Sequence, residues 1–234
     1  MSIEPLRGIR GCIFDAYGTL FDFASATRAC SDELGEKLGP LTALWRDKQL
    51  QYTWLLAAQH RHRGFDQVTG DALDFALETL DLSTSGLRDR LLDLYLTLSP
   101  FPEVEGVLTR LKEAGLRLAI LSNGTPRMLE QVVAGAGLGH LFDAVLSVEE
   151  VGIFKPARQV YQLGLDRLDL PREAVSFQSS NAWDAHGASA FGMRVVWCNR
   201  YAQRPERLPG RPDREVESLS PLPEIVVPPP QRNG

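Results

Sequence analysis

The sequence predicts an α/β protein with a Rossmann-like, doubly wound parallel sheet as its core and a helical cap domain inserted into that core. Two observations lead to this fold class. Short apolar runs of strand length alternate with helical segments, which is typical of a parallel sheet built from βαβ units. Between the first and second runs lie about one hundred residues that favour helices only, far more than a simple crossover needs.

The predicted strands are continuous apolar runs rather than strict alternations of apolar and polar residues. Runs of this kind are expected for parallel strands that are buried on both faces. A short stretch near the C-terminus, "EVESL" (215–219), favours one more strand. The five main runs span residues 9–14, 116–122, 144–148, 174–179 and 194–199.

The core helices are predicted between these runs. The first has Pro102 near its first turn and ends at Gly115, the usual asymmetry of helix ends. The predicted core helices span residues 102–115, 126–137, 156–168 and 181–192.

The inserted segment is predicted to form a separate cap domain. Breaks are expected at Gly39-Pro40, at Gly64 and between Asp81 and Gly86. Ligands of open α/β sheets bind outside the carboxyl ends of the strands, and the insertion leaves from such an end, so it is expected to lie over the site as a lid. The predicted cap helices span 25–38, 40–62, 68–81 and 86–98. The predicted domains are a discontinuous core, 1–20 and 101–234, and a cap, 21–100.

The composition is that of an ordinary globular chain. Of its 234 residues, 44% are hydrophobic, and the net charge is −5 with acidic and basic residues interspersed, which argues against a nucleic-acid surface. No apolar stretch reaches the length of a membrane span, and no signal core precedes the first strand. Three scattered cysteines give no metal spacing. We therefore expect a soluble protein of the cytoplasm, without a membrane or nucleic-acid partner.

Chemically capable side chains follow the predicted strands at one edge of the sheet. They are Asp15, Ser122 with Asn123, Lys155 and Asp184. Each alone has an ordinary structural interpretation: aspartate and asparagine belong to turns, an acid in a first helical turn favours the helix dipole, and lysine is usually exposed. Four such termini converging on one edge favour an active site instead.

The pattern resembles the haloacid dehalogenase superfamily over the whole chain apart from its last several residues. The four motifs of that superfamily are matched in order by Asp15 with Thr19, by Ser122, by Lys155 and by Asp184. Within it, "FDAYGTLFD", "WRDKQLQYTW", "FKPARQVY" and "SSNAWDAHGA" are similar to signatures of the (S)-2-haloacid dehalogenases, also called type II or L-2 enzymes.

The resemblance implies hydrolytic dehalogenation of short (S)-2-haloalkanoic acids to (R)-2-hydroxy acids and halide, through an ester of Asp15. It implies that Arg46 receives the halide, that Ser122 and the amide of Asn123 bind the substrate carboxylate, and that Asp184 orients water. The implied catalytic residues are Asp15, Thr19, Arg46, Ser122, Lys155, Tyr161, Ser179, Asn181 and Asp184. The implied substrate-binding residues are Ala16, Tyr17, Arg46, Leu50, Phe65, Ser122, Asn123, Lys155 and Trp183.

Tyr17 separates this chemistry from phosphoryl transfer. Phosphatases of the superfamily carry a second aspartate two residues after the nucleophile, which protonates the leaving alcohol and helps to hold Mg²⁺. Halide needs no proton, and a phenol with an ordinary pKa of about 10 is a poor acid. We therefore expect no metal and no cofactor. An Mg²⁺-dependent phosphatase on this fold, with an EDTA-sensitive activity, and a binding protein without turnover are the alternatives.

Several expectations concern single residues of the cap. Periodicity places Leu41, Leu44, Trp45, Tyr52 and Leu55 on one apolar helix face, and by itself leaves Arg46 solvated. The resemblance instead places Arg46 in the site, and it implies a homodimer. The histidines show no ligand spacing. His60 and His62 are expected to be solvated, and His186 to lie behind the residues that touch substrate.

Overall fold

The computed structural model describes residues 5–82 and 85–227. Its centre is one parallel sheet of six strands in the order β3-β2-β1-β4-β5-β6, which confirms the predicted fold class. The strand predicted within 215–219 is present but begins one residue earlier and ends at Val216, three residues short of its expected end. The strands are β1 (Gly11–Phe14), β2 (Arg117–Ser122), β3 (Ala144–Ser147), β4 (Val175–Ser179), β5 (Arg194–Cys198) and β6 (Arg214–Val216).

The strand order reverses at β1, and this places the site. The chain adds β2 and β3 on one side of β1, then returns to add β4, β5 and β6 on the other. Phe14, the last residue of β1, pairs with Ile120 of β2 and Gln178 of β4, so the carboxyl ends of these strands lie together. A doubly wound sheet leaves its ligand crevice at such a switch point.

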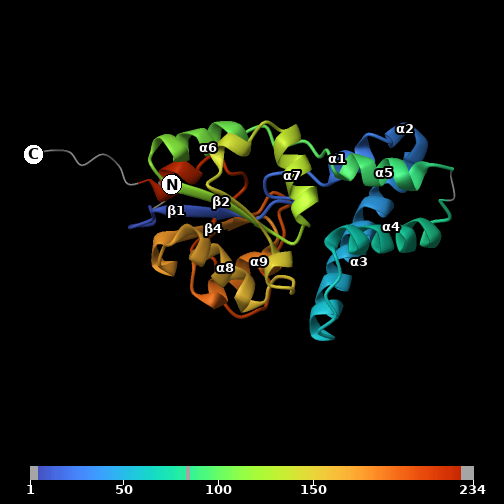
Figure 1. The fold of residues 1–234 in the computed structure, drawn as a ribbon. Coiled ribbons are helices and arrows are strands. Elements are labelled where there is room, and N and C mark those ends of the chain that lie inside the picture. Colours follow the sequence, from blue (N-terminus) through green and yellow to red (C-terminus); the bar gives the residue numbers. More distant parts are fainter. Residues whose placement is uncertain (1–4, 83–84, 228–234) are drawn as a thin grey trace, which may run out of the picture.

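Helices cover both faces of the sheet. Figure 1 shows α6 on one face, and α8 and α9 on the other. The helices of the core are α6 (Val104–Glu113), α7 (Pro126–Gly135), α8 (Arg158–Leu168), α9 (Ala182–Phe191) and α10 (Leu222–Val226), with short 3-10 turns at 139–141, 148–150 and 172–174.

The first five helices after β1, α1 to α5, gather beyond the carboxyl ends of the strands (Figure 1). The two connections to them run side by side: Phe21 pairs with Pro100, and the amide of Phe101 donates to the carbonyl of Leu20. The division into domains at these positions stays a prediction. The helices are α1 (Ala24–Arg28), α2 (Ser31–Leu34), α3 (Leu38–Ala58), α4 (Phe65–Thr79) and α5 (Leu87–Tyr95), with a 3-10 turn at 35–37.

Two boundaries predicted in this segment are wrong. The expected helix over 25–38 is broken into α1, α2 and a 3-10 turn, because Cys30 leaves the helical region with φ −111° and ψ 21°. The expected break at Gly39-Pro40 lies inside α3, which begins at Leu38. Proline is tolerated there because amides of the first turn have no intrahelical acceptor to lose.

The buried stripe of α3 also differs from the predicted apolar face. Leu41 and Trp45 are buried as expected, but Leu55 is 49% exposed. The stripe instead continues at four-residue spacing through Gln49 and Thr53, which are buried although they are polar. Apolar periodicity missed them because buried polar side chains are tolerated where they are hydrogen-bonded, and both are.

The solvated environment predicted for His62 is wrong. Its ring lies 4.8 Å from that of Phe154, and Nε2 is 3.3 Å from Oε1 of Glu149, so the half-buried side chain packs against the segment that precedes Lys155. His60 is exposed as expected, and His186 is buried. No helix of the described residues is long and apolar enough to cross a bilayer.

Candidate active site

Asp15 is presented by a tight loop that follows β1. The amide of Asp15 continues the sheet ladder to the carbonyl of Gln178, at 2.9 Å. The loop then closes on Ala16, whose carbonyl accepts from the amides of Thr19, Leu20 and Phe21. Gly18 has a φ of 88°, a conformation that other residues adopt only with strain. The carboxylate is thereby held at the carboxyl end of the central strand.

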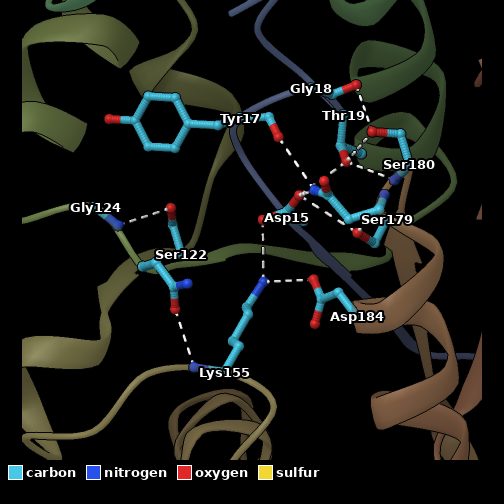
Figure 2. Close-up of polar contacts among 12 residues, drawn as sticks. Asp15, Tyr17, Gly18, Thr19, Ser122, Gly124, Lys155, Ser179, Ser180 and Asp184 are labelled. Carbon is cyan, nitrogen blue, oxygen red and sulfur yellow. Dashed lines mark hydrogen bonds and ion pairs between the residues drawn. The ribbon is translucent and has the colours of Figure 1, made fainter. Parts of the chain in front are cut away.

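One oxygen of Asp15 is bound by several donors from the core. Oδ2 accepts from Oγ1 of Thr19 at 3.1 Å, from Nδ2 of Asn181 at 2.8 Å and from Oγ of Ser179 at 3.4 Å (Figure 2). Ser180 supports Thr19: its amide donates to Oγ1 of Thr19, and its own hydroxyl donates to the carbonyl of Gly18. Sequence reasoning missed Ser180, although it lies inside the quoted "SSNAWDAHGA" stretch.

Lys155 lies between the two acids of the site. Its Nζ is 3.1 Å from Oδ1 of Asp15 and 2.9 Å from Oδ2 of Asp184, and its side chain is 1% exposed (Figure 2). Burial alone lowers the pKa of an ammonium, but the two carboxylates outweigh it and raise the pKa of Lys155 above its ordinary value. The ammonium therefore stays charged and holds both acids in place.

Asp184 is completely buried and has a second partner besides Lys155. The hydroxyl of Tyr161 donates to Oδ1 of Asp184 at 2.7 Å. Burial raises the pKa of Asp184, while the ammonium of Lys155 and the hydroxyl of Tyr161 oppose that rise. Burial raises the pKa of Tyr161 well above its ordinary value as well, so its hydroxyl remains a donor. The geometry gives a carboxylate that is more basic than an ordinary aspartate.

The loop after β2 offers donors to an anion. Oγ of Ser122 accepts from the amide of Gly124 at 3.1 Å, which leaves its own hydrogen free to donate. Oδ1 of Asn123 accepts from the amide of Lys155, which leaves the NH₂ group of Asn123 to donate. Ser147 fixes the loop by donating to the carbonyl of Gly124. Both Ser122 and Asn123 are buried.

Arg46 reaches this edge of the sheet from α3. Nη2 donates to Oδ1 of Asn181 at 3.1 Å, and the guanidinium lies 5.1 Å from the ring centre of Phe23. Asn181 stands at the N-terminus of α9, where asparagine usually caps the first turn with its side chain. Here that side chain makes no cap but bridges Arg46 and Asp15.

Tyr17 belongs to an aromatic cluster rather than to the polar groups. Its ring stacks on Tyr95 at 5.3 Å and lies 5.9 Å from Phe65. Burial raises the pKa of Tyr17 well above its ordinary value, and its hydroxyl has no hydrogen-bond partner among the described residues. The position two residues after Asp15 therefore supplies an apolar wall and no acid.

Leu50 and Trp183 lie on the other side of Arg46. Together with Arg46 and Asn181 they line a cavity of about 510 Å³. Trp183 also packs edge-on against Trp54 of α3, with 5.5 Å between ring centres. Asp15 is 6% exposed and does not itself line this cavity, but Asn181, which does, donates to its carboxylate.

The acids of the site are already compensated by a fixed cation. Among residues 5–82 and 85–227, no group of three or more His, Cys, Asp or Glu side chains is arranged to hold a metal ion. The Nζ of Lys155 lies between the carboxylates of Asp15 and Asp184.

Comparison with known proteins identifies the family. The model of the haloacid dehalogenase-like hydrolases matches residues 9–192. This chain belongs to that family. It is 45% identical to the (S)-2-haloacid dehalogenase of Pseudomonas sp. strain YL over 218 residues. The matched region covers 93% of this chain and 94% of that protein. It is 37% identical to haloacetate dehalogenase H-2 of Moraxella sp. strain B, over 95% of this chain and all of that protein.

A solved structure shares the fold of this haloacid dehalogenase-like hydrolase. The L-2-haloacid dehalogenase of Xanthobacter autotrophicus with chloropropionic acid covalently bound is 36% identical, with a TM-score of 0.86, over 93% of this chain and 98% of that one. The family resemblance inferred from the motifs is confirmed.

A further arginine that sequence reasoning missed, Arg200, supports the loop that carries Asp15. Arg200, just after β5, donates to the carbonyl of Thr19 at 2.8 Å and pairs with Glu103 at 2.6 Å. Its guanidinium lies 3.8 Å from the ring centre of Phe101. Arg200 thus ties the nucleophile loop to the chain that returns from the inserted helices. No motif carried this signal, because the residues are far apart in sequence.

Proposed function

We propose that this protein hydrolyses short (S)-2-haloalkanoic acids to (R)-2-hydroxy acids and halide. One observation carries the proposal: a buried carboxylate at a strand end has an arginine nearby and no acid at the position where a leaving alcohol would need one. Displacement of halide needs a nucleophile and an anion acceptor but no proton donor. Displacement of an alkoxide from a phosphate ester would need all three.

In the first step, Oδ1 of Asp15 attacks C2 of the substrate from the side opposite the halogen. A carbon–oxygen bond forms, and the carbon–halogen bond breaks with its electron pair leaving on the halide, toward Arg46. Oδ1 is the suitable oxygen because it has one donor, Lys155, whereas Oδ2 has three. Orienting two reactants contributes up to about 7–11 kcal/mol in well-aligned cases.

In the second step, water attacks the side-chain carbonyl carbon of Asp15 in the ester. The bond between that carbon and the product oxygen breaks, one proton of the water passes to the product hydroxyl, the other is released to solvent, and the carboxylate is restored. Asp184, made more basic by burial, orients the water, and Lys155 stabilises the charge that develops. Since only the first step displaces a group at C2, the configuration there is inverted once.

The substrate carboxylate is assigned to the donors after β2. The hydroxyl of Ser122, whose hydrogen is not used in its bond to Gly124, and the backbone amide of Asn123 are the assigned donors, and Arg46 adds a charged one. The wall of Tyr17 and Phe65 excludes water from the nucleophile. The neighbour solved with chloropropionic acid covalently bound supports an ester intermediate in this chain as well.

Halide release from each enantiomer of 2-chloropropionate, measured with EDTA present, tests the proposal. We expect chloride from the (S) enantiomer and (R)-lactate as the organic product. Absence of chloride, together with EDTA-sensitive hydrolysis of a phosphate ester, would establish the phosphatase alternative. Binding of the acid without turnover would establish a binding protein. In ¹⁸O water, a single turnover should place the label in Asp15 first.

A homodimer in the cytoplasm remains part of the proposal. The family resemblance supports the homodimer. The location is supported by the cysteines Cys12, Cys30 and Cys198, which are free and buried and form no disulfide in the described chain. Sedimentation velocity at micromolar concentration should give about twice the mass of one chain, 25.9 kDa. A single species of one-chain mass would contradict it.

A further inference from the structure

Gln49 is a buried polar residue one helical turn after Arg46 on α3. It is 1% exposed, and it lies on the stripe that faces α4. Burying an amide is costly unless its donors and acceptor are satisfied. Its hydrogen bonds show what this amide does.

The amide of Gln49 is held in one orientation by α4 and α5. Nε2 donates to Oγ1 of Thr69 at 2.8 Å, and Thr69 can only accept there because its own hydrogen goes to the carbonyl of Phe65 at 2.6 Å. The hydroxyl of Tyr95 lies within 3.3 Å of both ends of the amide. Turning the amide over would place its oxygen against Thr69 and lose this donor.

In that orientation, the oxygen of Gln49 points at Arg46. Nη1 of Arg46 donates to Oε1 of Gln49 at 2.7 Å, while Nη2 donates to Oδ1 of Asn181. Nδ2 of Asn181 in turn donates to Asp15. A chain of hydrogen bonds therefore runs from Thr69 in the inserted helices to the nucleophile in the core.

The chain holds Arg46 without neutralising it. Among the described residues, its hydrogen-bond acceptors are an amide from Gln49, an amide from Asn181 and the carbonyl of Tyr17, all of them uncharged. A carboxylate in place of the Gln49 amide would form a bidentate ion pair with the guanidinium. Arg46 would then attract a halide or a substrate carboxylate far less.

We propose that Gln49 is a positioning residue that aims Arg46 at the reacting site and keeps its positive charge available to the substrate and the departing halide. The inference rests on the proposed dehalogenation and adds a requirement to it. The side chain three residues after Arg46 must accept a hydrogen bond from Arg46 without carrying a charge, and it must also donate a hydrogen bond to Thr69. Glutamine meets both conditions, and glutamate meets neither.

The decisive variant is Gln49→Glu, which changes one amide into a carboxylate of the same shape. We expect kcat/KM for (S)-2-chloropropionate to fall about 100-fold, mainly through a higher KM, and inhibition by bromide to weaken at least about tenfold, since charged hydrogen bonds are of this strength. Gln51→Glu is the matched control. Gln51 is exposed on the same helix and its side chain accepts a hydrogen bond from Lys48, far from the hydrogen bonds of Arg46, so the kinetics of this variant should stay at the wild-type level.

A second variant separates positioning from folding. Gln49→Met keeps the approximate shape of the side chain and adds no charge. Arg46 should lose the hydrogen bond that orients it but keep its positive charge available, so kcat/KM should fall about tenfold. Melting temperatures are measured for both variants. A lower melting temperature with unchanged kinetics and unchanged bromide inhibition would overturn the proposal, because a merely structural residue behaves in that way.

Calorimetric titration with bromide keeps the inference independent of turnover. If the wild-type protein releases no halide from 2-chloropropionate, the proposed function fails, but weaker bromide binding by Gln49→Glu than by Gln51→Glu would still support the role of Gln49. If the wild-type protein turns over and bromide binds both variants equally, the inference alone fails.

Discussion

The two halves of the site hold their charges in opposite ways. In the core, Asp15, Lys155 and Asp184 form a buried chain of ion pairs in which both carboxylates share one ammonium as an oppositely charged neighbour. On the inserted helices, Arg46 is held by Gln49 and Asn181, which are neutral. The nucleophile and its acid partner must keep fixed positions through two steps, whereas Arg46 must receive a charge that arrives and departs. Paired ions suit the first task, and an unpaired cation suits the second.

The largest expected effect is in the core half. Asp15→Asn keeps the shape of the side chain but removes the attacking carboxylate, so kcat for chloride release should fall at least about 10⁴-fold. Steady-state chloride release measures it. Asp71→Asn, which alters an exposed ion pair with Arg63, should keep wild-type activity. Turnover by Asp15→Asn within tenfold of wild type would exclude Asp15 as the nucleophile.

Breaking the buried ion chain should damage both activity and folding. Lys155→Met leaves Asp15 and Asp184 buried without their cation, which typically costs about 3–5 kcal/mol in the free energy of unfolding. Chemical denaturation monitored by circular dichroism measures this cost. Lys112→Met removes an exposed pair with Asp143 and should cost about 1 kcal/mol or less. Equal losses in the free energy of unfolding for the two variants would show that the buried ion pairs of Lys155 stabilise the fold no more than an exposed pair does.

The half of the site that lies on the inserted helices is called the cap half, and changing its cation, Arg46, should affect substrate binding more than stability. Arg46→Lys keeps the charge but loses the planar fork that contacts Gln49 and Asn181 together, so KM should rise about tenfold with little change in melting temperature. Substrate saturation curves measure it. Arg63→Lys is the exposed control. A fall in kcat alone, without a change in KM or in bromide inhibition, would contradict the comparison between the halves.

The smallest expected effect is a shift in pH dependence. The hydroxyl of Tyr161 lowers the pKa of Asp184, which burial raises, by donating to its ionised form. Tyr161→Phe removes that donor, so the pKa of Asp184 should rise further, and the acid limb of the rate of ester hydrolysis should move to higher pH. Profiles of kcat against pH measure it, with Tyr52→Phe as control. An acid limb that stays in place or moves to lower pH would contradict this role of the Tyr161 hydroxyl.

The core half was largely predictable from sequence. Continuous apolar runs identify buried parallel strands, and the ends of such strands meet at one edge of the sheet. Asp15, Ser122, Lys155 and Asp184 could therefore be gathered in advance from their positions after those runs. The alternation of strands and helices followed from the same patterns, whereas the strand order came from the tertiary structure.

The cap half was not predictable to the same degree. Apolar periodicity put Leu55 inside and gave no reason to bury Gln49, because the pattern counts hydrophobic side chains and not hydrogen-bond partners on α4 and α5. The break at Cys30 and the helical start at Leu38 also had no clear local signal.

Sequence alone determined which groups stand at the strand ends. Apolar runs mark the buried strands, and in a parallel sheet the carboxyl ends of neighbouring strands meet at one edge. The tertiary structure decided which of those groups form ion pairs or hydrogen bonds with one another. It showed Lys155 bonded to both acids, Asn181 turned away from its cap toward Asp15, and Arg46 aimed by Gln49. The contacts to Asp15 join residues more than one hundred positions apart, the pair of Lys155 and Asp184 joins residues 29 apart, and the contact of Gln49 depends on how α3 packs on α4, so no short-range pattern encodes these placements.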